Sequence, residues 1–88
     1  MTYVYILSDY EEHGAENVVA TLDCKKLVSL IDENWSKEQG EYANDWKARA
    51  KSKLNEVLTH TEEILVKRTP WNLHDGWGGI QLHVVVLK

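Results

Sequence analysis

Apolar side chains follow two different spacings along this chain, one typical of strands and one typical of helices. Residues 3–7 form a short, almost continuous apolar run rich in aromatic and β-branched types, which indicates a central strand with both faces partly covered. After a polar stretch, residues 18–22 repeat this composition and predict a second strand. Residues 80–87 alternate between two sets of side chains, as in a strand whose even-numbered residues face one way.

Between these strands, apolar residues recur every three to four positions, which predicts two helices. Asp23 can accept hydrogen bonds from the free backbone N–H groups of a helix start, so the first helix is expected from there to about residue 35. A capping-box pattern at Ser36 predicts the start of a second helix, although Gly40 favours a start about one residue beyond it. The apolar stripe of this helix continues to about residue 60.

The fold class follows from the order of the elements. The apolar run at 64–66 favours a third strand within residues 62–68, with a continuation of the second helix as the alternative. Pro70 ends that element, and residues 69–79 have the glycines of an irregular loop. We therefore expect an α+β fold of order β-β-α-α-β-β, in which two hairpins form a small antiparallel sheet and a helical pair covers one face.

Composition limits the class of protein. A chain of 88 residues, 43% hydrophobic and 27% charged, is expected to form one folded domain spanning residues 1–88. The single cysteine, Cys24, cannot form an intramolecular disulfide, which favours a reducing compartment such as the cytoplasm. No run approaches the ~20 apolar residues that span a bilayer, so no membrane partner is expected. The net charge of −4 argues against a nucleic-acid partner, and apolar surface left uncovered by the helices would favour a homo-oligomer.

Two segments carry residues typical of a protein-binding site. Residues 9–16 concentrate carboxylates in an expected loop, and residues 69–79 place two tryptophans beside glycines. Tryptophans are frequent anchors of interfaces, and carboxylates steer association toward a basic surface. The alternatives are a solvated acidic loop and tryptophans that fold inward over the end of the sheet. The residues expected to bind a partner are Glu11, Glu12, Glu16, Trp71, His74 and Trp77.

Two other functions would draw on different groups. A small metal-dependent or hydrolytic enzyme would require both segments to meet and would use Asp9, His13, His74 and Asp75. The sequence has neither a calcium-loop spacing, nor a zinc-ligand spacing, nor a nucleophile elbow, so we expect no catalytic residue, metal or cofactor. A nucleic-acid-binding accessory protein would use the basic residues of the second helix, which are Lys47, Arg49, Lys51 and Lys53.

The opening segment YVYILSDYEEHGAENV, residues 3–18, resembles the start of small accessory proteins of phages and prophages. The resemblance covers the first third of the chain and contains no catalytic motif, so no functional residue is carried over from it. It implies a compact accessory protein in the host cytoplasm, and many such proteins bind and block a host enzyme or defence complex. The leading hypothesis is therefore a non-enzymatic protein-binding module that inhibits a host protein.

Overall fold

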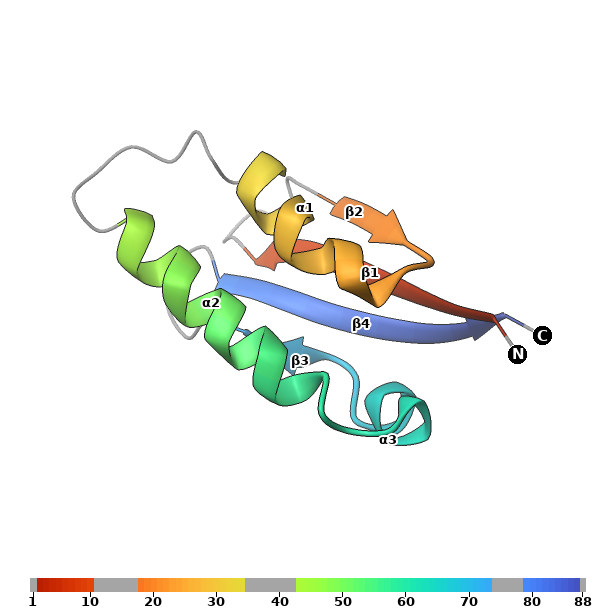
Figure 1. Ribbon diagram of the computed structural model, residues 1–88. Helices are drawn as coiled ribbons and strands as arrows, with labels where there is room; N and C mark the ends of the chain where they lie inside the picture. The colour runs from red at the N-terminus through yellow and green to blue at the C-terminus, as the bar shows by residue number, and fades with distance from the viewer. Residues whose placement is uncertain (1, 11–17, 35–42, 74–78, 88) are drawn as a thin grey trace.

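Two long strands form the centre of a four-stranded antiparallel sheet in the computed structural model, which describes residues 2–10, 18–34, 43–73 and 79–87 (Figure 1). The sheet order is β2-β1-β4-β3, and the strands are β1 (Thr2–Tyr10), β2 (Val18–Thr21), β3 (Trp71–Asn72) and β4 (Gly79–Leu87). β1 and β4 pair along their whole length, from Thr2 opposite Leu87 to Tyr10 opposite Gly79. The α+β class, the central position of the first strand and the antiparallel pairing of the first two strands are confirmed. The second hairpin differs from the expectation, because β4 pairs with Trp71–Asn72, which the sequence placed in an irregular loop, and not with residues 62–68.

The first two helical regions also agree with the sequence pattern. Asp23 caps the 3-10 helix η1 (Cys24–Lys26), where its carboxylate accepts a hydrogen bond from the Lys25 backbone N–H at 3.0 Å. η1 runs directly into α1 (Leu27–Asn34). The second helix, α2, is described from Ala43 to Val57, while the capping-box pattern at Ser36 lies outside the described residues.

The expectation of a strand within residues 62–68 is wrong, because this segment forms the helix α3 (Glu62–Lys67). Thr61 is its N-cap, and the Thr61 hydroxyl accepts from the Ile64 backbone N–H at 3.4 Å. Two glutamates occupy the first turn and Lys67 the last, which complements the helix dipole at both ends. Local capping and charge therefore outweigh the modest strand preference of the run at 64–66.

One face of the sheet is packed against α1 and α2, which lie on the same side in Figure 1. This covered face carries the odd-numbered residues of β1 and the even-numbered residues of β4, since Leu7 is paired with Leu82 and Tyr5 with Val84. The core between sheet and helices consists of Tyr5, Leu7, Leu27, Ile31, Ala50, Leu54, Val57, Leu65, Leu73, Ile80, Leu82 and Val84. Each of these side chains is at most 4% exposed, so the two layers bury a single continuous core.

The short edge strand β3 is extended by contacts on either side of it. Leu73 donates its backbone N–H to the carbonyl oxygen of Ile80 at 2.8 Å. At the other end of β3, the Thr69 hydroxyl accepts from the Val84 backbone N–H at 3.0 Å and donates to the Leu82 carbonyl oxygen at 3.3 Å. A side chain thus supplies hydrogen bonds to β4 where the two-residue strand has ended.

Candidate functional site

The acidic segment begins later than expected. Asp9 and Tyr10 belong to β1 and not to the loop, because both continue the pairing with β4. The Asp9 side chain points to the covered face, opposite Ile80, and is only 5% exposed. Asp9 is therefore a buried strand residue and does not present a carboxylate to solvent. The other residues proposed in this segment, Glu11, Glu12, His13 and Glu16, lie outside the described residues.

Trp71 is half-buried in β3, with its ring against the core. Its indole N–H donates to the carbonyl oxygen of Leu65 in α3 at 2.9 Å. The ring centroid lies 5.2 Å from that of His60, with the two planes tilted by 43°. Because the indole N–H is already bonded within the fold, only the exposed part of the ring is left for a partner. His74, Asp75 and Trp77 lie outside the described residues.

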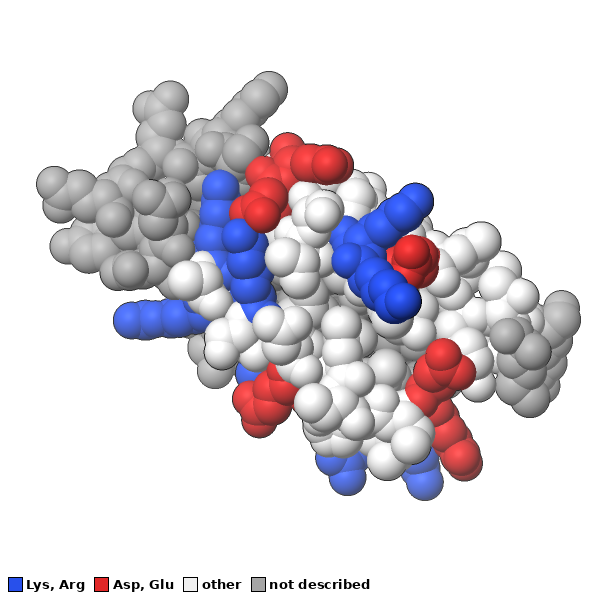
Figure 2. Space-filling view, viewed as in Figure 1, with Lys and Arg blue, Asp and Glu red and all other residues white. Residues whose placement is uncertain are grey.

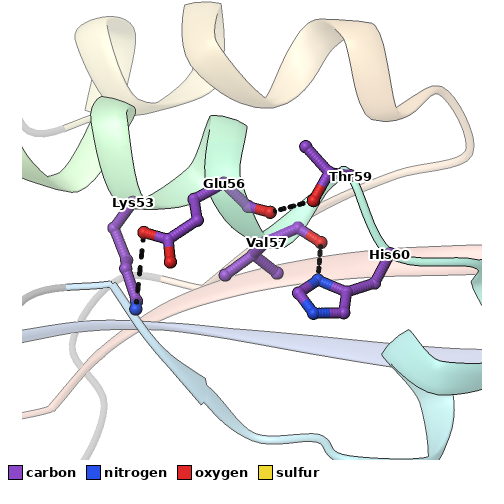
Figure 3. A network of polar contacts seen from close by, with 5 residues as sticks. All are labelled: Lys53, Glu56, Val57, Thr59 and His60. Atoms are coloured by element: carbon purple, nitrogen blue, oxygen red, sulfur yellow. Dashed lines mark hydrogen bonds and ion pairs between the residues drawn. The ribbon is translucent and has the colours of Figure 1, made fainter.

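His60 connects this aromatic contact to the end of α2. Its Nδ1 lies 2.9 Å from the Val57 carbonyl oxygen, and the Thr59 hydroxyl donates to the Glu56 carbonyl oxygen at 2.6 Å (Figure 3). These side-chain contacts add to backbone bonds at the end of α2, because the same two carbonyl groups also accept from the Thr59 N–H at 3.2 Å and the His60 N–H at 3.1 Å. His60 and Trp71 therefore have structural roles in joining α2, α3 and β3.

The paired ends of β1 and β4 place the attachment points of both candidate loops at one end of the sheet. Tyr10, the last residue of β1, pairs with Gly79, the first residue of β4. Residues 11–17 connect Tyr10 to β2, and residues 74–78 end at Gly79. Both segments thus leave the sheet from paired, neighbouring strands. The sequence alone did not establish this proximity.

Charged side chains of both signs are interspersed over the helical side of the molecule (Figure 2). Lys51 of α2 forms an ion pair with Asp32 of α1. Lys53 lies 3.7 Å from the Glu56 carboxylate one turn later (Figure 3). Two of the four cations proposed for nucleic-acid binding are therefore paired with carboxylates, which reduces the positive field available for a phosphate backbone.

The opposite face of the sheet has a surface that the sequence did not identify as a site. Strand register places on it the even-numbered residues of β1 and the odd-numbered residues of β4, together with their neighbours in β2 and β3. We call this surface the open sheet face, and its described side chains are those of Thr2, Val4, Ile6, Ser8, Val18, Ala20, Asn72, Gln81, His83, Val85 and Leu87.

The open sheet face has no Asp, Glu, Lys or Arg among its described positions, and His83 is its one titratable side chain there. Figure 1 shows α1 and α2 on the other side of the sheet. Val18, Val85 and Leu87 are 60%, 42% and 53% exposed. Solvated faces of antiparallel sheets normally present polar side chains, so the valine, isoleucine and leucine residues make this face more apolar than such a face usually is.

On this face, the two central strands are more polar at one end than at the other. At one end, Ser8 lies opposite Gln81, whose side-chain amide donates to the Asn72 side-chain oxygen at 2.9 Å. Toward the other end, Val4 lies opposite Val85 and Thr2 opposite Leu87. Ile6 lies between His83 on β4 and Ala20 on β2. On β1 and β4, apolar residues therefore predominate from the middle of the sheet toward the chain termini, while Val18 of β2 lies beside Ser8 at the other end.

The sequence did contain a signal for this surface. Residues 3–7 are apolar at odd and even positions alike, and the odd set of residues 80–87 includes Val85 and Leu87. We expected both faces to be partly covered, whereas α1 and α2 pack on one face only. Apolar residues on the second face, without helices to cover them, are the feature that sequence reasoning missed.

Tyr5 is a core residue whose phenol has a raised pKa. Burial raises the pKa of its phenol above 10.0, and Cys24 and Glu62 nearby raise it further. Cys24 is a half-buried free thiol directly after the N-cap Asp23. This arrangement stabilises the neutral phenol and leaves Tyr5 a core residue.

The described residues offer no metal site, and the chain has no match among known proteins. No group of three or more His, Cys, Asp or Glu side chains among the described residues could hold a metal ion. Within the same residues, no helix combines the length and the hydropathy needed to cross a membrane. The chain matches no protein-family model, no curated protein and no solved structure.

Proposed function

We propose that this chain is a non-enzymatic protein-binding module and that the open sheet face is its main binding surface. The observation that carries the proposal is a combination of three features of this face: its apolar residues, the absence of charge at its described positions, and the position of α1 and α2 on the other side of the sheet. Contiguous exposed apolar surface is uncommon on monomeric domains and marks sites of association.

The apolar residues of this face supply the energy of binding. Val85 and Leu87 remain about half exposed and lie on the same side of β4. Complete burial of each by a partner would contribute roughly 1 kcal/mol at ordinary transfer values. Val4 and Ile6, which lie opposite β4, would be buried at the same time. Several such contributions together suffice for a specific complex of moderate affinity.

Our proposal also assigns a role in binding to the two loop segments. Residues 11–17 and 74–78 leave from the end of the sheet at which Tyr10 pairs with Gly79. Carboxylates there, such as Glu11, would steer the module toward a basic region of the partner, and Trp77 would act as an anchor. In a phage setting, the partner would be a host enzyme or defence complex, and its inhibition would take place in the host cytoplasm.

The proposal is tested by capture of a partner from lysate of the natural host. Val85→Lys places a charge in the apolar patch, and Ala48→Lys places the same charge on an exposed position of α2. Both positions are exposed, so circular dichroism and urea unfolding should show that both variants fold. We expect Val85→Lys to reduce capture of a specific protein at least about tenfold, because a buried unpaired ammonium is strongly unfavourable.

Ala48→Lys should capture the same protein as the unmodified chain. If both lysine variants retain the partner equally, or if capture is absent from the unmodified chain, the open sheet face is not the binding surface of such a module.

A further inference from the structure

We infer that the open sheet face is covered by the same face of a second copy of this chain, which makes the protein a homodimer with two sheets packed between two helical layers. This inference rests on the proposed function, because it names the protein that occupies the proposed binding surface. Other proteins would then compete with the second copy for this face, or bind at the loop end of the sheet.

Charge favours a second copy on this face over a basic partner. Each chain carries a net charge of −4, so most contacts between two copies would bring like charges together. The described residues of the open sheet face contain no carboxylate, ammonium or guanidinium group. Two such faces can meet without burying a like charge, whereas a basic partner surface would find no opposite charge on them.

The shape of the face also fits a second sheet. Val4, Ile6 and Val85 project from regular, paired strands, as do the side chains on the inner faces of a β-sandwich. Two sheets packed in this way lie about 10 Å apart, with side chains of both interdigitating. In a two-fold contact each copy presents the same patch to the other, so Val4, Ile6 and Val85 of both copies can be buried together.

The available area sets the expected strength of the dimer. Two paired strands of nine residues each, broadened by the four residues of β2, form the patch. At a rise of about 3.4 Å per residue and a strand spacing of about 4.8 Å, this corresponds to roughly 350 Å² of sheet per copy. Two copies would cover about 700 Å² in total, which is smaller than a standard specific interface. We therefore expect a reversible dimer with a dissociation constant in the micromolar range or above.

Sedimentation velocity on the purified chain tests the inference. A series from about 1 µM to 1 mM spans the affinities that such an interface allows. We expect a shift from monomer to dimer across this series, and an increase of at least about tenfold in the dissociation constant for Val85→Lys. Ala48→Lys should dimerise like the unmodified chain, since Ala48 lies on the helical side.

A milder variant keeps the test independent of folding. Val85→Thr preserves the β-branched shape and adds one hydroxyl, so it should also weaken the dimer while unfolding like the unmodified chain. Concentration-dependent amide shifts in NMR spectra should be confined to β1, β2 and β4 and be absent from α1 and α2.

Two results would overturn the dimer. One is a monomer throughout the concentration series, and the other is a dimer that neither Val85 variant weakens. If the chain is monomeric but captures a host protein in a Val85-dependent manner, the binding module stands and only the second copy is excluded. If neither association depends on Val85, both proposals fail.

Discussion

Thr69 holds the edge of the sheet through a single hydroxyl group. It lies between α3 and β3, where its Oγ1 accepts from the Val84 backbone N–H at 3.0 Å and donates to the Leu82 carbonyl oxygen at 3.3 Å. Thr69→Val replaces this hydroxyl with a methyl group of nearly the same size. The substitution therefore removes two hydrogen bonds while it preserves the shape and the β-branching of the side chain.

The free energy of unfolding should fall by about 1–2 kcal/mol in Thr69→Val. Val84 is only 1% exposed, so its N–H group cannot simply bond to bulk water when the hydroxyl is lost. An unsatisfied buried donor costs about 1–3 kcal/mol, and the extra methyl group offsets part of that cost. The longer bond to Leu82 contributes less. In a domain of this size the loss corresponds to a decrease in Tm of about 4–16 °C.

Urea unfolding followed by circular dichroism measures this loss, and NMR hydrogen exchange should show faster exchange of the Val84 amide. Thr69→Ser is the matched control because it keeps the hydroxyl, and it should retain most of the stability. The reasoning is refuted if Thr69→Val unfolds within about 0.3 kcal/mol of the unmodified chain, or if Thr69→Ser is destabilised as much as Thr69→Val.

Three further substitutions test separate parts of the structure. Because burial raises the pKa of Tyr5, its contribution to stability is fully present below the ordinary value of about 10 and is lost as the pH rises from there through the raised pKa. Tyr5→Phe should therefore flatten the decline of the unfolding free energy at alkaline pH in urea titrations. Trp71→Phe removes the hydrogen bond to the Leu65 carbonyl oxygen and should lower the unfolding free energy by about 1–2 kcal/mol, and an unchanged value would show that this bond contributes nothing. Thr61→Ala removes the N-cap of α3 and should cost about 1 kcal/mol in the same assay, whereas Thr61→Ser should cost less.

The structural role of Trp71 changes how partner binding should be tested. Trp71 and Trp77 were both expected to bind a partner, but replacing the pair by alanine would also remove the core contacts of Trp71 and its bond to Leu65. Trp71→Phe combined with Trp77→Ala keeps an aromatic ring in the core. Loss of partner capture in that variant, with unfolding still cooperative, would assign an anchoring role to Trp77.

Local patterns in the sequence predicted most of the secondary structure. Residues 80–87, whose alternation predicted a strand, lie in β4, and Asp23 caps the first helical segment as its sequence position indicated. These features depend on neighbouring residues, through strand alternation and through capping of free N–H groups. At 62–68 the prediction was wrong, because strand preference and helix capping conflicted there and Thr61 was the stronger signal. The strand at Trp71–Asn72 was also missed, because it depends on pairing with β4 and lies in a segment with the glycines of a loop.

The candidate site could be predicted only in part. Composition identified the two loop segments, but their residues from Glu11 to Glu16 and from His74 to Trp77 lie outside the described residues and stay predictions. Among the described candidates, Trp71 packs against the core, and Asp9 is buried on the covered face of the sheet. The sequence indicated which residue types could bind, without showing where their strands would place them.

By itself, the sequence determined the α+β class and the division of each long strand into two alternating sets of side chains. The tertiary structure alone decided that β1 pairs with β4, that β2 and β3 lie at the edges, and that α1 and α2 cover one face. Alternation separates two faces but does not say which of them the helices will cover, because that depends on how distant strands pair and on which side the connections cross. For this reason Tyr5 became a core residue, while its neighbour Ile6 lies on the open sheet face.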